Sequence, residues 1–189
     1  MNNWNKRNAL WMLLYASLYA ITTALVCVTG MIHPVFFVCY QITAGILLTG
    51  IIIRAFARVK APGAACFLAA GMILLLIVIN DAAPWHVIPV IIIAALAEVI
   101  RAVSKYSWKG DVAAAAVMSF SSFGYYGQIW LNRAFTYQSA VEEMPAGYAD
   151  SLMAVSPAWA LPVVVIIGII ASVIISNATA KIFKLNKEN

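Results

Sequence analysis

The chain has 189 residues, of which 64% are hydrophobic and only 10% are charged. Soluble domains carry roughly 25% charged residues, so this composition excludes a soluble domain and indicates an integral membrane protein. The formal net charge is +5, but the basic residues are scattered in small groups between apolar runs. That distribution is a topological signal of membrane proteins and argues against a nucleic-acid partner.

The apolar runs predict an all-α membrane protein. One helical crossing of the ~30 Å hydrocarbon core takes about 20 apolar residues, so the chain has room for about six spans in one domain. The runs are too long and too little alternating for the strands of a membrane barrel. We therefore expect a single domain, residues 1–189, with six transmembrane helices at 9–29, 35–53, 64–79, 87–103, 111–130 and 158–182.

Short turns separate several of these runs. Residues 30–34 form a turn that carries His33, and residues 80–86 form a second turn that ends at His86. Asp111 is expected to cap the fifth helix, because an aspartate side chain accepts hydrogen bonds from the free N–H groups of a first helical turn.

Lysine and arginine are divided unequally between the two sides of the predicted bundle. With six spans, both termini share one side with the second and fourth connections, and this side holds eleven of the twelve Lys and Arg residues, Lys187 included. The opposite side holds only Arg133. Because cytoplasmic segments are enriched in Lys and Arg, we expect both termini to be cytoplasmic in the cell (plasma or inner) membrane, with His33, Asp81 and His86 facing outward.

Residues 123–159 hold most of the polar chemistry of the chain, and their connection between the fifth and sixth spans is roughly 25 residues long. Loops longer than about 12 to 15 residues are uncommon in compact domains and are often lids or binding loops. We therefore expect this long outer loop to contain the wall and lid of a binding site.

Aromatic and polar side chains are mixed in this segment. Trp and Tyr are enriched at membrane interfaces simply as anchors, whereas Gln128 and Asn132 beside them suit a small, flat ligand such as a pyrimidine, a pterin or a tetrapyrrole. Arg133 pairs either with a ligand carboxylate or phosphate or with Glu142 or Glu143. The candidate substrate-binding residues are Trp85, His86, Tyr125, Tyr126, Gln128, Trp130, Asn132, Arg133, Tyr137 and Trp159.

Two further sets of residues have a functional and a structural interpretation. Glu98 is a carboxylate within an apolar run, which makes it a functional candidate, but Arg101 lies three residues later on the same face and favours a structural ion pair. His33 and His86 could share a metal ion or a metal chelate, since imidazole is a common ligand. Their spacing does not require it, and we expect no metal site.

The three cysteines do not predict a disulfide or a metal site. Cys27, Cys39 and Cys66 are odd in number and lack CxxC spacing. We expect them to be buried apolar side chains and not disulfide partners or metal ligands.

No catalytic set can be assembled from the sequence. There is no HExxH, no GxSxG and no GxxxxGK[ST] motif. The pair Glu142 and Glu143 is similar to the glutamates of intramembrane CAAX-type proteases, but Gly147 stands four residues later in place of an arginine. No helix carries the repeated polar stripe of a water-filled pore. We expect neither an enzyme nor a channel, and no cofactor.

Small residues form one face of the first predicted helix. Ala16, Ala20 and Ala24 recur at intervals of four residues, so they lie on the same side of the helix and let another backbone approach closely. This face is either a docking surface for another protein or ordinary packing inside the bundle.

Three parts of the chain carry a family resemblance. They are residues 81–89 (DAAPWHVIP), the pair Ala97 and Glu98, and residues 147–162 (GYADSLMAVSPAWALP), of which the last is the most specific. With them the chain resembles, over nearly its whole length, the S components of energy-coupling-factor (ECF) transporters in the MptD-like group, also called the Trep_Strep family of integral membrane proteins.

The resemblance implies a substrate-binding protein that hydrolyses nothing itself. It would capture a vitamin, metal chelate or related micronutrient outside the cell and dock on a transmembrane coupling subunit, which carries two ATPase subunits that use ATP. The spacing of Ala16 and Ala20 is similar to the small-residue motif with which S components dock. The alternative is a structural or assembly membrane protein whose outer loop binds a protein partner.

Overall fold

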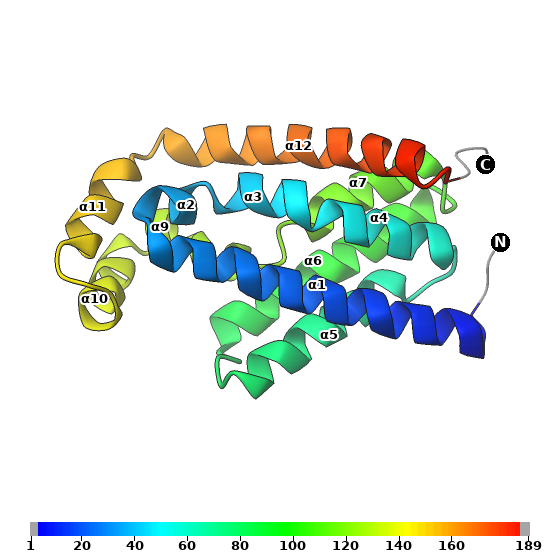
Figure 1. Cartoon of the computed structure of the whole chain (residues 1–189), viewed down its shortest axis with the longest axis horizontal. Coiled ribbons are helices and arrows are strands. Elements are labelled where there is room, and N and C mark those ends of the chain that lie inside the picture. The colour runs from blue at the N-terminus through cyan, green and yellow to red at the C-terminus, as the bar shows by residue number, and fades with distance from the viewer. Residues whose placement is uncertain (1–3, 186–189) are drawn as a thin grey trace.

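The computed structural model describes residues 4–185, and every regular element in that range is an α-helix. The long helices lie lengthwise side by side, with the start of α1 and the end of α12 at one end of the molecule and α10 and α11 at the other (Figure 1). The helices are α1 (Lys6–Ile32), α2 (Pro34–Val38), α3 (Tyr40–Leu47), α4 (Thr49–Arg58), α5 (Ala64–Val78), α6 (Pro84–Val103), α7 (Trp108–Met118), α8 (Phe123–Tyr126), α9 (Gln128–Leu131), α10 (Arg133–Glu143), α11 (Tyr148–Val155) and α12 (Ala160–Ile182).

Four helical stretches of the described chain are long and apolar enough to cross a membrane. They are α1, the continuous stretch Tyr40–Arg58 of α3 and α4, α6, and α12. Their outward sides carry large apolar residues, such as Leu25 at 59% and Ile166 at 57% exposure. Lipid satisfies such side chains but not backbone polar groups, so helices with apolar outer faces are suited to a bilayer. The all-helical membrane class is thereby confirmed.

The structure differs from the expected six spans in two helices. Helix α5 has 15 residues, and at 1.5 Å per residue it is about 22 Å long, less than a ~30 Å hydrocarbon core. The fifth span, expected at 111–130, is broken into α7, α8 and α9, of which the longest has 11 residues. The break follows Ser119, whose hydroxyl donates to the Ala116 carbonyl at 2.7 Å and so offers the backbone an alternative to the helical bond.

Two helix starts also differ from expectation. The side chain of Ser107, and not Asp111, caps α7 by accepting from Gly110 N. Asp111 lies in the first turn, where its carboxylate is buried against Arg101. Helix α6 begins at Pro84, so His86 belongs to its first turn and not to the preceding loop. Proline fits this first position because its missing N–H would have no helical partner there.

The long connection expected as a loop is instead two helices. Helices α10 and α11 pack on each other, and α11 also packs on α2. Gly147 begins α11 with a left-handed backbone (φ 81°), which glycine adopts without steric cost. The Tyr148 hydroxyl then donates to the carbonyl of Gly30 at the end of α1. The connection is therefore an ordered helical cap on one end of the bundle.

The bundle is packed closely where α3 crosses α12. A Cβ atom at Gly45 would lie 2.6 Å from the Gly168 carbonyl oxygen, so only glycine fits there. Beside this contact a buried polar chain joins four helices, because Gln41 accepts from the Tyr126 hydroxyl and donates to Ser119 at 2.9 Å. The chain continues from Ser172 to Ser119 at 3.3 Å. Such side-chain bonds join helices inside a bilayer.

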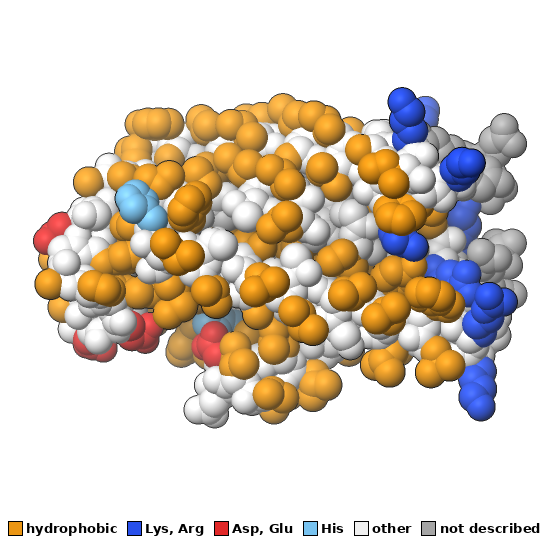
Figure 2. Space-filling view, viewed as in Figure 1, with side chains coloured by type: hydrophobic (Ala, Val, Ile, Leu, Met, Phe, Trp, Pro, Cys, Tyr) orange, Lys and Arg blue, Asp and Glu red, His pale blue; other side chains and the backbone are white. Residues whose placement is uncertain are grey.

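Charge is segregated along the long axis. Lys and Arg side chains gather at the end where α1 starts and α12 ends, while Asp and Glu side chains lie toward the opposite end, on the face shown in Figure 2. Lys187, counted in the sequence prediction, lies outside the described residues. The segregation is what a fixed orientation in a membrane requires, and the cytoplasmic location of the basic end stays a prediction.

Candidate functional site

A histidine and an aspartate form a polar cluster where α5 turns into α6. The His86 Nδ1 atom lies 3.0 Å from a carboxylate oxygen of Asp81 and 3.1 Å from the Asp81 carbonyl oxygen. The His86 side chain is 11% exposed and that of Asp81 44%. Because both neighbours of Nδ1 are acceptors, this nitrogen carries the proton, and Nε2 is left for another partner.

Tyr125 of α8 completes this cluster. Its ring stands edge-on to the His86 ring with centroids 5.5 Å apart, and it also packs on Phe37 of α2 at 5.2 Å. The close approach of α8 to α6 depends on Gly124, where a Cβ atom would lie 2.0 Å from the Trp85 carbonyl oxygen. The broken fifth span therefore delivers Tyr125 to the start of α6.

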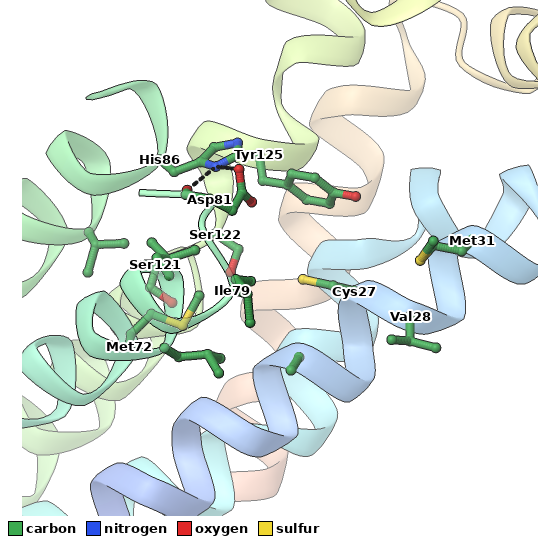
Figure 3. A pocket seen from close by; sticks show the side chains of 14 residues that line it. Cys27, Val28, Met31, Met72, Ile79, Asp81, His86, Ser121, Ser122 and Tyr125 are labelled. Carbon is green, nitrogen blue, oxygen red and sulfur yellow. Dashed lines mark hydrogen bonds and ion pairs between the residues drawn. The ribbon is translucent and has the colours of Figure 1, made fainter. Parts of the chain in front are cut away.

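Two cavities meet at Asp81, His86 and Tyr125. The helix cavity, about 310 Å³, lies between α1, α5, α6 and the turn before α8. The lid cavity, about 410 Å³, lies beneath α10 and α11. Both volumes are in the range of small-molecule sites. Figure 3 shows the helix cavity with the bonded Asp81 and His86 at its edge and Tyr125 beside them.

Four of the sequence-predicted substrate-binding residues line the lid cavity: Trp85, His86, Tyr125 and Gln128. The Trp85 ring packs edge-on to Phe135 of α10 at 6.1 Å, and the Gln128 amide donates to the Gly124 carbonyl at 3.2 Å. These residues are brought together at one end of the bundle. The structure thus gives part of the predicted set a common cavity.

Other residues of that set have structural contacts instead. Tyr126 is fully buried and stacks on Tyr40 with centroids 4.6 Å apart, so it belongs to the core. Trp130 donates from Nε1 to the Pro157 carbonyl at 3.1 Å, while Trp159 is 68% exposed and lines neither cavity. An exposed Trp at a helix end is typical of an interface anchor.

Arg133 does not pair with Glu142 or Glu143, and its pairing with a ligand stays a prediction. Its guanidinium donates to the Ser156 carbonyl at 2.7 Å and to the Met153 carbonyl at 3.1 Å, and no ion pair with Glu142 or Glu143 occurs within residues 4–185. The last carbonyls of a helix lack helical partners and attract cations. Arg133 therefore ties the start of α10 to the end of α11.

Two more predicted residues lie at the exposed side of α10. Asn132 precedes the helix and makes no side-chain capping bond to it. The Tyr137 hydroxyl donates to Asp150 at 3.0 Å, and this bond raises the pKa of the Tyr137 phenol above its ordinary value. Tyr137 therefore joins α10 to α11, and neither Asn132 nor Tyr137 lines either of the two cavities.

One face of α10 lines the lid cavity but was not among the site residues predicted from the sequence. Thr136, Ser139, Ala140 and Glu143 line the lid cavity. Their spacing of three and four residues is that of one helix face, and it would have indicated them had the segment been taken as a helix. Thr136 is buried, and its hydroxyl has no partner among the described residues. An unpaired buried hydroxyl beside a cavity is an available hydrogen-bonding group for a ligand.

The alanine face of α1 is largely buried inside the helical bundle. Ala16 is 3% exposed and Ala20 6% exposed, and a Cβ atom at Gly71 of α5 would lie 2.9 Å from the Ala16 Cβ. Ala24 lines the helix cavity. In this structure Ala16 and Ala20 are therefore internal packing and not a free docking surface, whereas Ala24 is partly exposed at the cavity.

Glu98 and Arg101 lie 3.7 Å apart, but Asp111 is the closer partner of Arg101, at 2.8 Å. The buried guanidinium also donates to the Val59 carbonyl at 2.7 Å. Glu98 accepts from the Ala65 amide at the start of α5. This cluster joins α4, α5, α6 and α7 at the basic end, so its geometry is that of a structural tie.

The histidines do not converge. His33 accepts from the Val35 amide at 3.2 Å as the cap of α2, and it lines neither cavity. Among the described residues no three His, Cys, Asp or Glu side chains are arranged to hold a metal. Cys27 and Cys39 are half-buried, but Cys66 is exposed, because it lies on the outward side of α5.

The family model of hypothetical bacterial integral membrane proteins called Trep_Strep matches residues 7–185. The chain belongs to this family. No curated protein and no solved structure matches it. Membership of Trep_Strep identifies a bacterial integral membrane protein, in agreement with the four apolar helices, and the family description names no ligand.

Proposed function

We propose that this Trep_Strep protein is a solute-binding membrane protein, the S component of an ECF-type importer. The observation that carries the proposal is the pair of cavities that share Asp81, His86 and Tyr125 beneath the helical cap of α10 and α11. The lid cavity lies beneath α10 and α11 and shares Asp81, His86 and Tyr125 with the helix cavity. Lys and Arg side chains gather at the end of the molecule opposite α10 and α11 (Figures 1 and 2). If the basic end lies on the cytoplasmic side of the cell membrane, the site faces the outside of the cell, where an importer binds its solute.

The resemblance to S components supports the same proposal, because its two longest blocks build this site. Residues 81–89 form the wall that contains Asp81 and His86, and residues 147–162 form α11 and the start of α12. The solute would be a vitamin, a metal chelate or another micronutrient. The protein would hydrolyse nothing and hold no cofactor, and ATP would be used by two partner ATPase subunits.

The partner in the proposal is a transmembrane coupling subunit. Since Ala16 and Ala20 are buried and Ala16 packs on Gly71 of α5, it would bind elsewhere on the surface. The outward side of α1 is apolar, with Leu18, Ile21 and Leu25 all exposed by more than two fifths, and it fits lipid as well as another helix.

Purification of the tagged protein from membranes of its native host tests this function. We expect a coupling membrane protein and two ATPases in the purified complex, and a bound small molecule in native mass spectrometry. A His86→Ala variant should keep the complex and lose most of the small molecule. Ile174→Ala, at an exposed position of α12 that lines neither cavity, should keep both. A preparation with neither ATPases nor a bound molecule would overturn the proposal. An extracytoplasmic protein found in place of the ATPases would favour the structural alternative.

A further inference from the structure

The two cavities differ in polarity. Among the described residues, the helix cavity adds to the three shared residues only Ser121 and Ser122 as polar side chains. The Ser121 hydroxyl already accepts a hydrogen bond from the Tyr19 hydroxyl. The lid cavity adds Gln128, Thr136, Ser139 and Glu143. A ligand part in the helix cavity therefore meets mostly hydrocarbon, and a part in the lid cavity meets hydrogen-bonding groups.

The helix cavity opens on the lipid-facing side of the bundle. Its lining includes Val28, Met31 and Ile79, which are 51%, 54% and 54% exposed. Helices α1 and α5 are in close contact at Ala16 and Gly71 and diverge toward this end, where the lobe of α5 and α6 stands away from the rest (Figure 1). The opening is therefore lined by exposed apolar side chains.

The lining also restricts the charge of a ligand. The described residues that line the two cavities include Asp81 and Glu143 but no Lys or Arg. The guanidinium of Arg133 donates its hydrogen bonds to carbonyl groups at the end of α11. An anionic head group would lie beside carboxylates without a cation, which is unfavourable, whereas aromatic rings of Trp85 and Tyr125 and the carboxylates favour a cationic or neutral aromatic group.

We propose that the two cavities form one bipartite site for an amphipathic solute. Its neutral or cationic aromatic head occupies the lid cavity, between Trp85, Gln128 and Thr136, and its apolar tail occupies the helix cavity, past His86 and Tyr125. The inference rests on the proposed solute-binding function and adds the chemical class of the solute.

Chain-length dependence of binding tests the inference. The full-length protein in lipid nanodiscs is titrated calorimetrically with N-alkylpyridinium ions from ethyl to hexyl, and with 4-alkylbenzoates of matched length, after subtraction of heats from empty nanodiscs. Burial of one methylene is worth about 0.8 kcal/mol, so each added methylene should tighten pyridinium binding about fourfold. The benzoates should bind at least tenfold more weakly than pyridinium ions of equal chain length.

Two variants of neighbouring residues locate the tail. Ala24→Phe fills the helix cavity, and it should abolish the gain from longer chains while leaving ethylpyridinium affinity within twofold of the original. Leu25→Phe changes the adjacent, lipid-facing position, which is 59% exposed, and it should keep the chain-length dependence. If Ala24→Phe is not monodisperse, Val28→Trp at the cavity mouth serves the same purpose.

Several outcomes would overturn the inference. They are equal chain-length dependence in all variants, as expected if a lipid chain permanently occupies the helix cavity, equal affinity for benzoates, or no pyridinium binding at all. Ethylpyridinium binding without a gain from longer chains would remove the tail site and leave solute capture intact. Absence of the ATPase complex in the purification described above would instead remove the importer function and leave the bipartite site standing.

Discussion

The Nδ1 atom of His86 lies 3.0 Å from the Asp81 carboxylate across the turn between α5 and α6. The carboxylate fixes the imidazole with its Nε2 atom available, in the manner in which carboxylates orient functional histidines. Because both residues line both cavities, this pair occupies the junction of the proposed site. In the proposed function, its role is to orient a hydrogen-bonding group toward the solute.

We expect Asp81→Asn to weaken retention of the bound molecule. A hydrogen bond to a charged group contributes about 1.5 to 3 kcal/mol, which corresponds to a loss of roughly 10- to 100-fold in affinity. Native mass spectrometry checks this by measuring the fraction of purified protein that still carries the bound molecule, at several protein concentrations. Glu142→Gln is the matched control, because Glu142 is exposed and lines neither cavity. Equal losses in both variants would show a general effect of outer charge and not an effect on His86.

The Arg101 and Asp111 pair should control stability and not binding. Arg101 is fully buried and Asp111 1% exposed, and the guanidinium also lies over the Phe56 ring at 4.2 Å. Asp111→Ala removes the closer carboxylate of a buried guanidinium and leaves only Glu98, at 3.7 Å. It should destabilise the protein by about 3 kcal/mol, the lower end of the range for a broken buried ion pair. Thermal unfolding in detergent measures this.

A double variant separates the charge effect from packing. Arg101→Met with Asp111→Leu removes both charges and should recover most of the lost stability, because apolar residues of similar volume often replace a buried ion pair without cost. Lys109→Ala, on the exposed side of the same helix, should change the unfolding temperature little. A double variant as unstable as Asp111→Ala would show that the side-chain shapes, and not the charges, stabilise this junction.

The membrane class and the positions of the four long apolar helices followed from sequence because they depend on composition and on local patterns. Runs of about 20 apolar residues have one stable arrangement in lipid, a helix. The division of α7 from α8 could not be predicted in this way. It accompanies a close approach of Gly124 to the Trp85 backbone, which joins positions far apart in the chain and leaves no local sequence pattern.

The candidate site was predictable in part. Trp85, His86, Tyr125 and Gln128 were indicated by chemistry and position, and they share the lid cavity. The roles of Arg133 and Tyr126 were not predictable, because a guanidinium bound to helix-end carbonyls and a tyrosine stacked in the core have the same local sequence signals as ligand-binding residues. Only the tertiary structure distinguishes these cases.

Two glycines of one membrane span should differ in tolerance to alanine. A Cβ atom at Gly45 would lie 2.6 Å from the Gly168 carbonyl oxygen, whereas one at Gly50 would lie 3.3 Å from the Thr179 hydroxyl. Gly45→Ala forces α3 from α12 and should cost about 1 to 3 kcal/mol, as overpacking does. Gly50→Ala should be nearly neutral or slightly stabilising, because alanine is the better helix former. Thermal unfolding of both variants in the same detergent checks the difference, and equal destabilisation would contradict the packing of α3 on α12.

The contact of Tyr148 with Gly30 should hold the helical cap closed. The Tyr148 hydroxyl donates to the Gly30 carbonyl, so Tyr148→Phe removes one hydrogen bond, worth about 1 kcal/mol. Hydrogen exchange of α11 amides should then be about fivefold faster, while exchange in α12 stays unchanged. Tyr15→Phe, in the part of α1 far from the cap, is the control. Unchanged exchange in α11 would show that apolar packing alone holds it.

The bond between Tyr137 and Asp150 should respond to alkaline pH. Its acceptor raises the pKa of the phenol above the ordinary value of about 10, so the bond stabilises the folded state fully below that value. The contribution is lost as pH rises through the higher pKa of the folded state. The ultraviolet absorbance of tyrosinate, taken as the difference between the original protein and Tyr137→Phe, isolates this one titration. It should lie above the ordinary range and return toward it in Asp150→Asn, because that change removes the carboxylate acceptor. A midpoint unaffected by Asp150→Asn would show that this contact does not persist in solution.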